Sequence, residues 1–145
     1  MNTKTLLVKP NLTLQERISA GKYYSSNKEI TERLFPHDPS TVGKWEWKLI
    51  PCSIFTPFDS AKKICEEDGW QAAKVEHLLS LGEMLSIHGK GEMVILPLSS
   101  SLRSEKSIHS PALWNTLSGK HILCFIDVLI LYRHFDSALS VRKIC

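Results

Sequence analysis

The chain has 145 residues, of which 43% are hydrophobic and 23% are charged, and its formal net charge is +3. This ordinary globular composition excludes an intrinsically disordered chain, a collagen-like repeat and a coiled coil. The mild positive charge permits a nucleic-acid-binding protein but does not indicate one, because such modules usually carry a denser basic stripe.

Residues 1–44 predict a helical N-terminal extension that packs on the rest of the chain. Thr13 and Glu16 have the spacing of a capping box, which marks the start of a helix. A second short helix is expected over residues 27–34, and Pro36 prevents it from continuing. Both helices are amphipathic, so each needs a larger surface on which to pack.

Residues 45–145 predict an α+β domain that begins with a strand and two helices. Aromatic and charged residues alternate from Trp45 onward, which is typical of a half-buried strand. Thr56 is expected to cap a helix whose first residue is Pro57, and a second helix is expected through Val75 as far as Gly82. The predicted apolar stripe of the first of these helices is Phe58, Ala61, Ile64 and Cys65.

The second half of the chain predicts an antiparallel sheet over residues 92–145, and we expect its last strand to lie beside the strand that begins at Trp45. A polar, serine-rich loop, Ser99–Ser110, interrupts the strands. A glycine-containing turn then predicts a hairpin. The expected strands are Met93–Leu96, Ala112–Thr116, His121–Phe125 and Ala138–Ile144.

The most apolar run, residues 122–132, is too short for a membrane span, which needs roughly twenty apolar residues. Asp127 stands inside this run. Two interpretations are open: a buried acid with a shifted pKa at a functional site, or a residue in the turn between two strands. We favour the turn. Because the N-terminus does not read as an export signal, we expect a cytoplasmic protein that has no membrane partner.

The four cysteines do not form a Cys-x-x-Cys pair, so the sequence predicts neither a structural zinc site nor any other cofactor. In a reducing cytosol they are expected to be buried, reduced thiols. The four residues are Cys52, Cys65, Cys124 and Cys145.

The segment AKKICEEDGW at residues 61–70, followed by Glu76-His77-Leu78-Leu79, resembles bacterial C-type-lectin-like modules of unknown function. The ending SVRKIC at residues 140–145 is similar to the last strand of those modules, and also to the tail of a set of bacterial proteins of unknown function. The resemblance covers residues 45–145 and implies a lectin-like arrangement in which the first and last strands are neighbours.

What the resemblance implies about ligands is limited. The calcium-binding pattern of the lectins is missing, since Trp114-Asn115-Thr116 lacks the required carboxylate. Calcium and sugar binding are therefore not implied. In secreted relatives a first-helix cysteine bridges a last-strand cysteine, and the matching positions here are Cys65 and Cys145; without an export signal we do not expect the bridge.

Each candidate ligand-binding residue has a structural alternative. Trp114 and Asn115 follow the polar loop, and we expect Trp114 to be the best exposed of the four tryptophans, with Trp70 and at least one of Trp45 and Trp47 in the core. The other candidates are Arg103, Asp127 and His134. His134 and Asp136 could share one strand face, but a metal site needs further ligands, so none is predicted.

Nothing in the sequence forms a recognisable catalytic signature. The leading hypothesis is a non-enzymatic binding module that recognises a protein or other macromolecule through loops around residues 97–120. One alternative is a small enzyme with a Cys/His or His/Asp site. The other is a nucleic-acid-associated protein, although a solvated surface accounts better for the loosely clustered cations Arg103, Lys106, Lys120, Arg133, Arg142 and Lys143.

Overall fold

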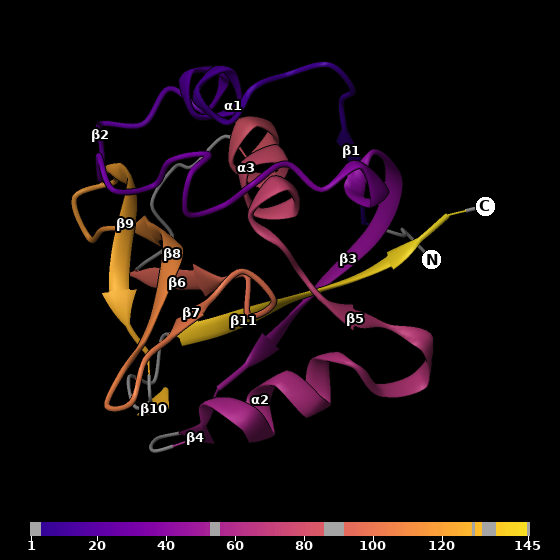
Figure 1. Cartoon of the computed structure of the whole chain (residues 1–145), viewed down its shortest axis with the longest axis vertical. Coiled ribbons are helices and arrows are strands. Elements are labelled where there is room, and N and C mark those ends of the chain that lie inside the picture. The colour runs from indigo at the N-terminus through magenta and orange to yellow at the C-terminus, as the bar shows by residue number, and fades with distance from the viewer. Residues whose placement is uncertain (1–3, 53–55, 86–91, 129, 132–135, 145) are drawn as a thin grey trace.

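A large mixed β-sheet organises the chain, with helices on both of its faces (Figure 1). The computed structural model describes residues 4–52, 56–85, 92–128, 130–131 and 136–144. The helices are α1 (Leu14–Ala20), α2 (Phe58–Cys65) and α3 (Val75–Met84), with short 3-10 helices at Pro39–Thr41 and Glu67–Gly69. The combination confirms the predicted α+β class.

Seven strands of the described chain lie side by side in the order β1-β3-β11-β6-β8-β9-β2, while β5 pairs with β11 and β7 with β8. A separate two-stranded ribbon joins β4 and β10. The strands are β1 (Thr5–Val8), β2 (Ser25–Ser26), β3 (Gly43–Pro51), β4 (Thr56–Pro57), β5 (Gln71–Ala72), β6 (Met93–Leu96), β7 (Leu102–Arg103), β8 (Ile108–Asn115), β9 (His121–Asp127), β10 (Ile130–Leu131) and β11 (Asp136–Lys143).

The prediction that the first and last strands of residues 45–145 are neighbours is confirmed. The last strand, β11, runs antiparallel to β3, with Val141 opposite Trp47. The predicted hairpin is present as β8 and β9, and β6 is a central strand between β11 and β8. The prediction of a purely antiparallel sheet is wrong, however, because β11 runs parallel to β6, with Ser137 opposite Ile95.

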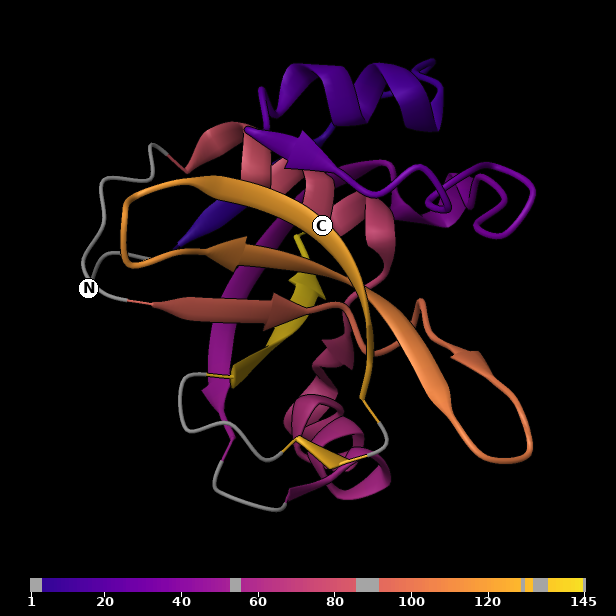
Figure 2. The same cartoon turned by 90° about the vertical axis from the view of Figure 1, so that its left-hand side faces the viewer.

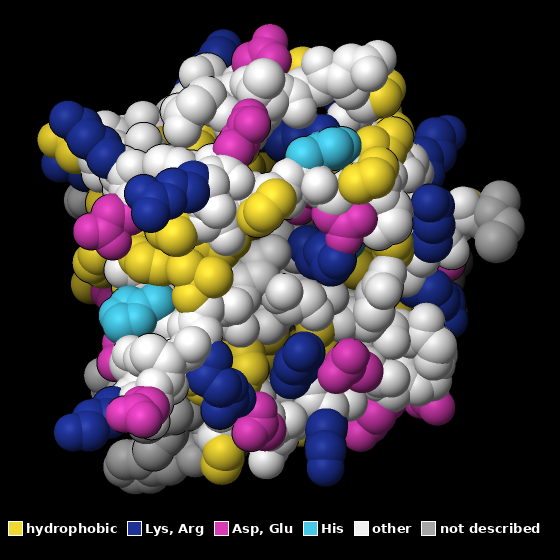
Figure 3. Space-filling view, viewed as in Figure 1, with side chains coloured by type: hydrophobic (Ala, Val, Ile, Leu, Met, Phe, Trp, Pro, Cys, Tyr) yellow, Lys and Arg dark blue, Asp and Glu magenta, His cyan; other side chains and the backbone are white. Residues whose placement is uncertain are grey.

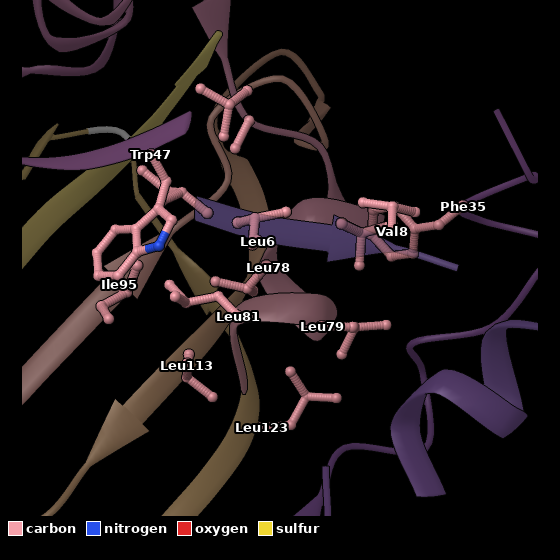
Figure 4. Close-up of a cluster of buried hydrophobic side chains, with 14 of the residues drawn as sticks. Leu6, Val8, Phe35, Trp47, Leu78, Leu79, Leu81, Ile95, Leu113 and Leu123 are labelled. Carbon is pink, nitrogen blue, oxygen red and sulfur yellow. The ribbon is translucent and has the colours of Figure 1, made fainter. Parts of the chain in front are cut away.

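One face of the sheet carries a large apolar core beneath α3, and α1 packs outside α3 (Figure 1). The α3 residues Leu78 and Leu81 lie among side chains from β1, β3, β6, β8 and β9 (Figure 4). All of α3 from Val75 to Gly82 is buried, as expected of a helix that is covered on every side. Gly82 makes room for Tyr23, because a Cβ atom there would lie 2.2 Å from the Tyr23 hydroxyl and would displace that side chain.

The opposite face of the sheet carries a second, smaller core beneath α2 (Figure 2). Phe58, Ala61 and Cys65 form the buried stripe of this helix. Ile64, predicted to belong to the same stripe, is 42% exposed. At about 100° per residue it lies some 60° beyond Ala61, at the border of the buried face.

Thr56 is not the helix cap that we predicted. The capping position is occupied by Pro57, whose backbone is extended, and no side chain caps the helix. The reason is that Thr56 and Pro57 are still in a strand, β4, which pairs with β10. The helix therefore begins one residue later than predicted.

The N-terminal segment, residues 1–44, is less helical than predicted. The capping box of Thr13 and Glu16 is present and starts α1. The helix expected over residues 27–34 is absent, because Asn27 donates its backbone N–H to the Leu123 carbonyl and so continues the pairing of β2 with β9. Strand β1 pairs with β3, so this segment contributes an edge to the same sheet.

Candidate functional site

The pocket at the start of α3, here called the α3 pocket, has a volume of about 230 Å³ and opens between three segments. The segments are residues 34–38, the first turn of α3 and residues 99–102. Its lining residues are Leu34, Phe35, Pro36, Asp38, Lys74, Val75, Glu76, Ser99, Ser100, Ser101 and Leu102. An apolar wall with a few convergent polar groups is the usual form of a binding site.

An ion pair between Lys74 and Asp38 closes one side of the α3 pocket. Lys74 stands at the N-cap of α3, where the positive end of the helix dipole disfavours a cation. The Asp38 carboxylate offsets the charge of Lys74 and the positive end of the helix dipole. It also accepts hydrogen bonds from the Ser40 backbone N–H and hydroxyl. The bond from Lys74, followed by those from Ser40, holds the pKa of Asp38 well below its usual range.

Glu76 lies beneath this ion pair and is only 3% exposed. Its Oε2 accepts a hydrogen bond of 2.7 Å from the Asp38 backbone N–H and lies 3.6 Å from His37 Nδ1. A buried carboxylate needs such donors, because desolvation without compensation is costly. Glu76 therefore fixes the residue 37–38 segment against α3.

The serine-rich segment is attached to the same helix end. The Val75 backbone N–H donates to Ser100 Oγ at 2.7 Å, which satisfies one of the donors left open at the start of a helix. The Ser99 N–H donates to the Ala73 carbonyl at 2.9 Å. The wall of the pocket made by residues 99–101 is thus held in place by one side-chain and one main-chain hydrogen bond.

His77 follows Glu76 in α3 and is 2% exposed. Its Nδ1 accepts the Lys74 backbone N–H at 2.9 Å, and its ring meets Trp45 edge-on with centroids 4.3 Å apart. Burial, together with the Lys74 charge, lowers the pKa of His77 to about 3. The imidazole is therefore neutral at physiological pH and supports the helix end as a hydrogen-bond acceptor.

A second pocket, here called the β7 pocket, adjoins the first at Leu102 and has a volume of about 310 Å³. The two are also linked beneath the surface, where Phe35 and Phe125 meet edge-on with centroids 6.0 Å apart. Hydrophobic side chains gather beside a histidine on the part of this face that lies over β8 and β9 (Figure 3). The β7 pocket is lined by Glu29, Leu102, Arg103, Ser104, His109 and Phe125.

Arg103 is the one sequence-predicted site residue that lines a pocket described here. It is exposed on β7 and pairs with Asp59 at 2.9 Å. Trp114 and Asn115 end β8, and both are half-buried rather than exposed. Trp114 packs against the core beneath α2, so it is only partly exposed.

Trp70, predicted to be a core residue, belongs to neither apolar core and lies half-buried near the surface. Trp45 and Trp47 are both buried, as predicted for at least one of them. Asp127 is exposed at the end of β9, and β10 begins at Ile130, which agrees with a turn rather than a buried acid. His134 lies outside the described residues, so its predicted role has no structural counterpart here.

The residues that sequence reasoning missed are Phe35, Asp38, Lys74 and Glu76. The segment Asp38-Pro39-Ser40 carries a local signal, since an aspartate before proline is typical of a helix start, and it does begin a 3-10 helix. The pairing of Asp38 with Lys74 has no such signal, because 36 residues separate the two.

The described residues hold no group of three or more His, Cys, Asp or Glu side chains that could bind a metal ion. No described helix has the length and apolarity to cross a membrane. Comparison with protein-family models, curated proteins and solved structures finds no match to the chain. The geometry of the site is therefore the basis for any functional assignment, and the lectin-like resemblance stays an expectation.

Proposed function

We propose that the protein is a non-enzymatic binding module that recognises a protein partner through the α3 pocket and the β7 pocket. The observation that carries this proposal is that two pockets adjoin at Leu102, within the region 97–120 that the sequence favours for recognition. Side-chain-sized recesses beside one another suit two neighbouring residues of a partner.

The linings of the two pockets and the size of the α3 pocket support a protein ligand over a cofactor. The α3 pocket, at about 230 Å³, is smaller than the roughly 300–1,000 Å³ of small-molecule sites, and the β7 pocket, at about 310 Å³, lies at the lower end of that range. Aromatic and aliphatic floors formed by Phe35, Leu102 and Phe125 have polar rims formed by Lys74 and Arg103. An apolar centre with a polar, solvated rim is the usual anatomy of a protein–protein interface.

The enzymatic alternative, a Cys/His or His/Asp site, gains no support from Cys65. This last residue of α2 is fully buried, and burial raises the pKa of its thiol to about 12. A nucleophilic cysteine needs the opposite, a lowered pKa and access to a substrate. The polar groups of the α3 pocket are instead engaged in holding its walls together.

Peptides selected from a random phage-displayed library against the wild-type protein test the proposal. Leu102→Asp is expected to weaken their binding by about tenfold or more, because it places a charge between the two pockets. The matched control is Leu117→Asp, since Leu117 is 77% exposed on the β8–β9 turn and lines neither pocket.

Arg103→Ala, which truncates an exposed rim residue, is a second variant that should leave the fold intact. It is expected to weaken the same peptides, and melting curves of all three variants check their folding. Peptides that bind Leu102→Asp and Arg103→Ala as tightly as the wild type would show that recognition occurs elsewhere. Failure to select any binding peptide would also contradict the proposal.

A further inference from the structure

Five cations lie at the end of the sheet where β1, β3 and β11 meet. Because side chains alternate along a strand, Lys44, Lys48 and Arg142 share the face of Glu46, whereas Lys4 and Lys143 lie on the opposite face, over Trp47 and Trp45. Lys and Arg side chains line this side of the molecule in Figure 3, where Figure 1 places β1, β3 and the end of β11. The five cations, here called the basic strand end, are Lys4, Lys44, Lys48, Arg142 and Lys143.

The basic strand end concentrates more charge than the whole chain carries. With Glu46 included its formal net charge is +4, whereas that of the chain is +3, so the remainder of the chain is slightly acidic. The cations noted from the sequence alone were scattered, and only Arg142 and Lys143 of that group lie here. Residues 66–68, which are acidic and precede Trp70, form its border toward α2.

Neutralisation of these charges within the protein is slight. Arg142 bonds Glu46 at 3.0 Å, and the other four cations have no carboxylate within ion-pair distance among the described residues. Three of these four lie over aromatic rings: Lys48 over Trp70, Lys4 over Trp47 at 5.0 Å and Lys143 over Trp45 at 5.6 Å. Such contacts keep an ammonium group at the surface without cancelling its charge.

Trp70 is the aromatic residue on which this surface centres. Lys48 Nζ lies 4.1 Å from the centroid of its ring and the Arg142 guanidinium 4.6 Å. Trp70 is half-buried and the two cations lie over its ring, so a base that stacks on the indole takes the place of one of them. A row of cations next to an aromatic ring on a strand surface is the combination by which proteins hold single-stranded nucleic acid: the cations contact phosphates and the ring stacks on a base.

We propose that the basic strand end binds single-stranded nucleic acid, independently of the pockets around Leu102. A membrane surface fits less well, because peripheral membrane binding typically uses an amphipathic helix with an apolar face that inserts between lipids. The basic strand end is built on strands and offers two exposed aliphatic neighbours, Leu7 and Ile144, rather than the apolar face of a helix. An acidic protein would use the charges but would leave the Trp70 ring without a role.

Fluorescence anisotropy with a labelled oligothymidylate tests the proposal. Three phosphate contacts, from the cations that share the face of Trp70, predict that affinity falls about 20-fold between 50 and 200 mM NaCl, because each contact releases counterions. Lys44→Glu/Lys48→Glu removes two of these contacts, so the fall should shrink to about threefold, with weaker binding at the low salt concentration. Trp70→Leu should weaken binding by about tenfold and leave the salt dependence unchanged, whereas Trp70→Phe keeps a stacking ring and should bind nearly as the wild type does.

The charge-matched control is Lys28→Glu/Lys120→Glu, which makes the same change in net charge near the β2–β9 edge at the other side of the sheet. It should bind the oligonucleotide more tightly than Lys44→Glu/Lys48→Glu. Equal losses in the two double variants would overturn the proposal, as would the absence of binding at low salt. Competition by poly-glutamate as strong as that by oligothymidylate, or binding only to phosphatidylserine vesicles, would also overturn it in favour of an acidic protein or a membrane.

Discussion

The Ser140 hydroxyl donates a hydrogen bond of 2.6 Å to the carbonyl of Cys65, and both residues are fully buried. This bond ties the last turn of α2 to the central strand β11, although 75 residues separate the two in sequence. The carbonyls at the end of a helix lack partners within the helix. Ser140 supplies one of them from across the layer between helix and sheet.

Replacing Ser140 with alanine is expected to lower the free energy of unfolding by about 1–3 kcal/mol, because it leaves a buried carbonyl without its donor. Ser137→Ala is the matched control. Ser137 lies on the same strand and is buried, but its hydroxyl bonds to no described residue. Urea denaturation should separate the two variants, and equal stability would show that the Ser140 bond is not important for holding α2.

Deleting residues 140–145 should unfold or aggregate the protein. In the structure β11 contacts β3, β5 and β6, so the deletion removes Val141 from the core beneath α3 as well as the Ser140 bond to α2. A broadened or absent thermal transition, together with an increased tendency to aggregate, would agree with this expectation. A truncated chain that kept its full cooperative transition would show that the strand is dispensable.

Features with a local cause were predictable from the sequence. The capping box joins Thr13 to Glu16, only three positions along the chain, and is present. The alternation around Trp45 reflects a strand with two distinct faces, and the apolar run at Met93 reflects one covered on both. Thr56 shows where local reasoning ends: its sequence favours a cap, but pairing of β4 with β10 takes the residue into a strand.

Ser140 and Trp70 show what local patterns miss. The alternation of Leu139 and Val141 with Ser140 suggests that Ser140 faces solvent, yet α2 covers that side of the sheet and buries it. Trp70 and Trp114 are both half-buried, although we expected Trp70 in the core and Trp114 at the surface, because their burial depends on which helix or loop lies above them. The α3 pocket is built from residues 34–38, 74–76 and 99–102, so its assembly requires the tertiary fold.

Cys65 is expected to react with a thiol reagent more slowly than Cys124 at neutral pH. Its thiol is fully buried and its pKa is raised to about 12, first by burial and then by Cys52, so very little thiolate forms. Cys124, which is only half-buried, should react earlier. Alkylation followed by peptide mapping measures both rates, with urea-unfolded protein as the control. Rapid modification of Cys65 in the native protein, or a Cys65–Cys145 disulfide in protein kept under reducing conditions, would contradict this.

His77 should make the protein less stable in mild acid. Its pKa in the folded chain is about 3 because it is buried beside Trp45 and Lys74, whereas the unfolded chain binds its proton near the ordinary value of 6.5. The folded pKa is the lower one, so the full stability is present above pH 6.5 and is lost progressively as the pH falls toward 3.

The expected loss is about 1 kcal/mol between pH 7.5 and 5.5, measured as the free energy of urea unfolding. Asp38, whose pKa is lowered by Lys74 and Ser40, contributes only below its ordinary value of 3.8 and so does not act in this window. The matched variant is His77→Gln, because glutamine at this helix position can still accept the Lys74 backbone N–H but does not titrate. Its stability should change less over the same interval. If His77→Gln lost as much stability as the wild type, the pH dependence would arise from another group.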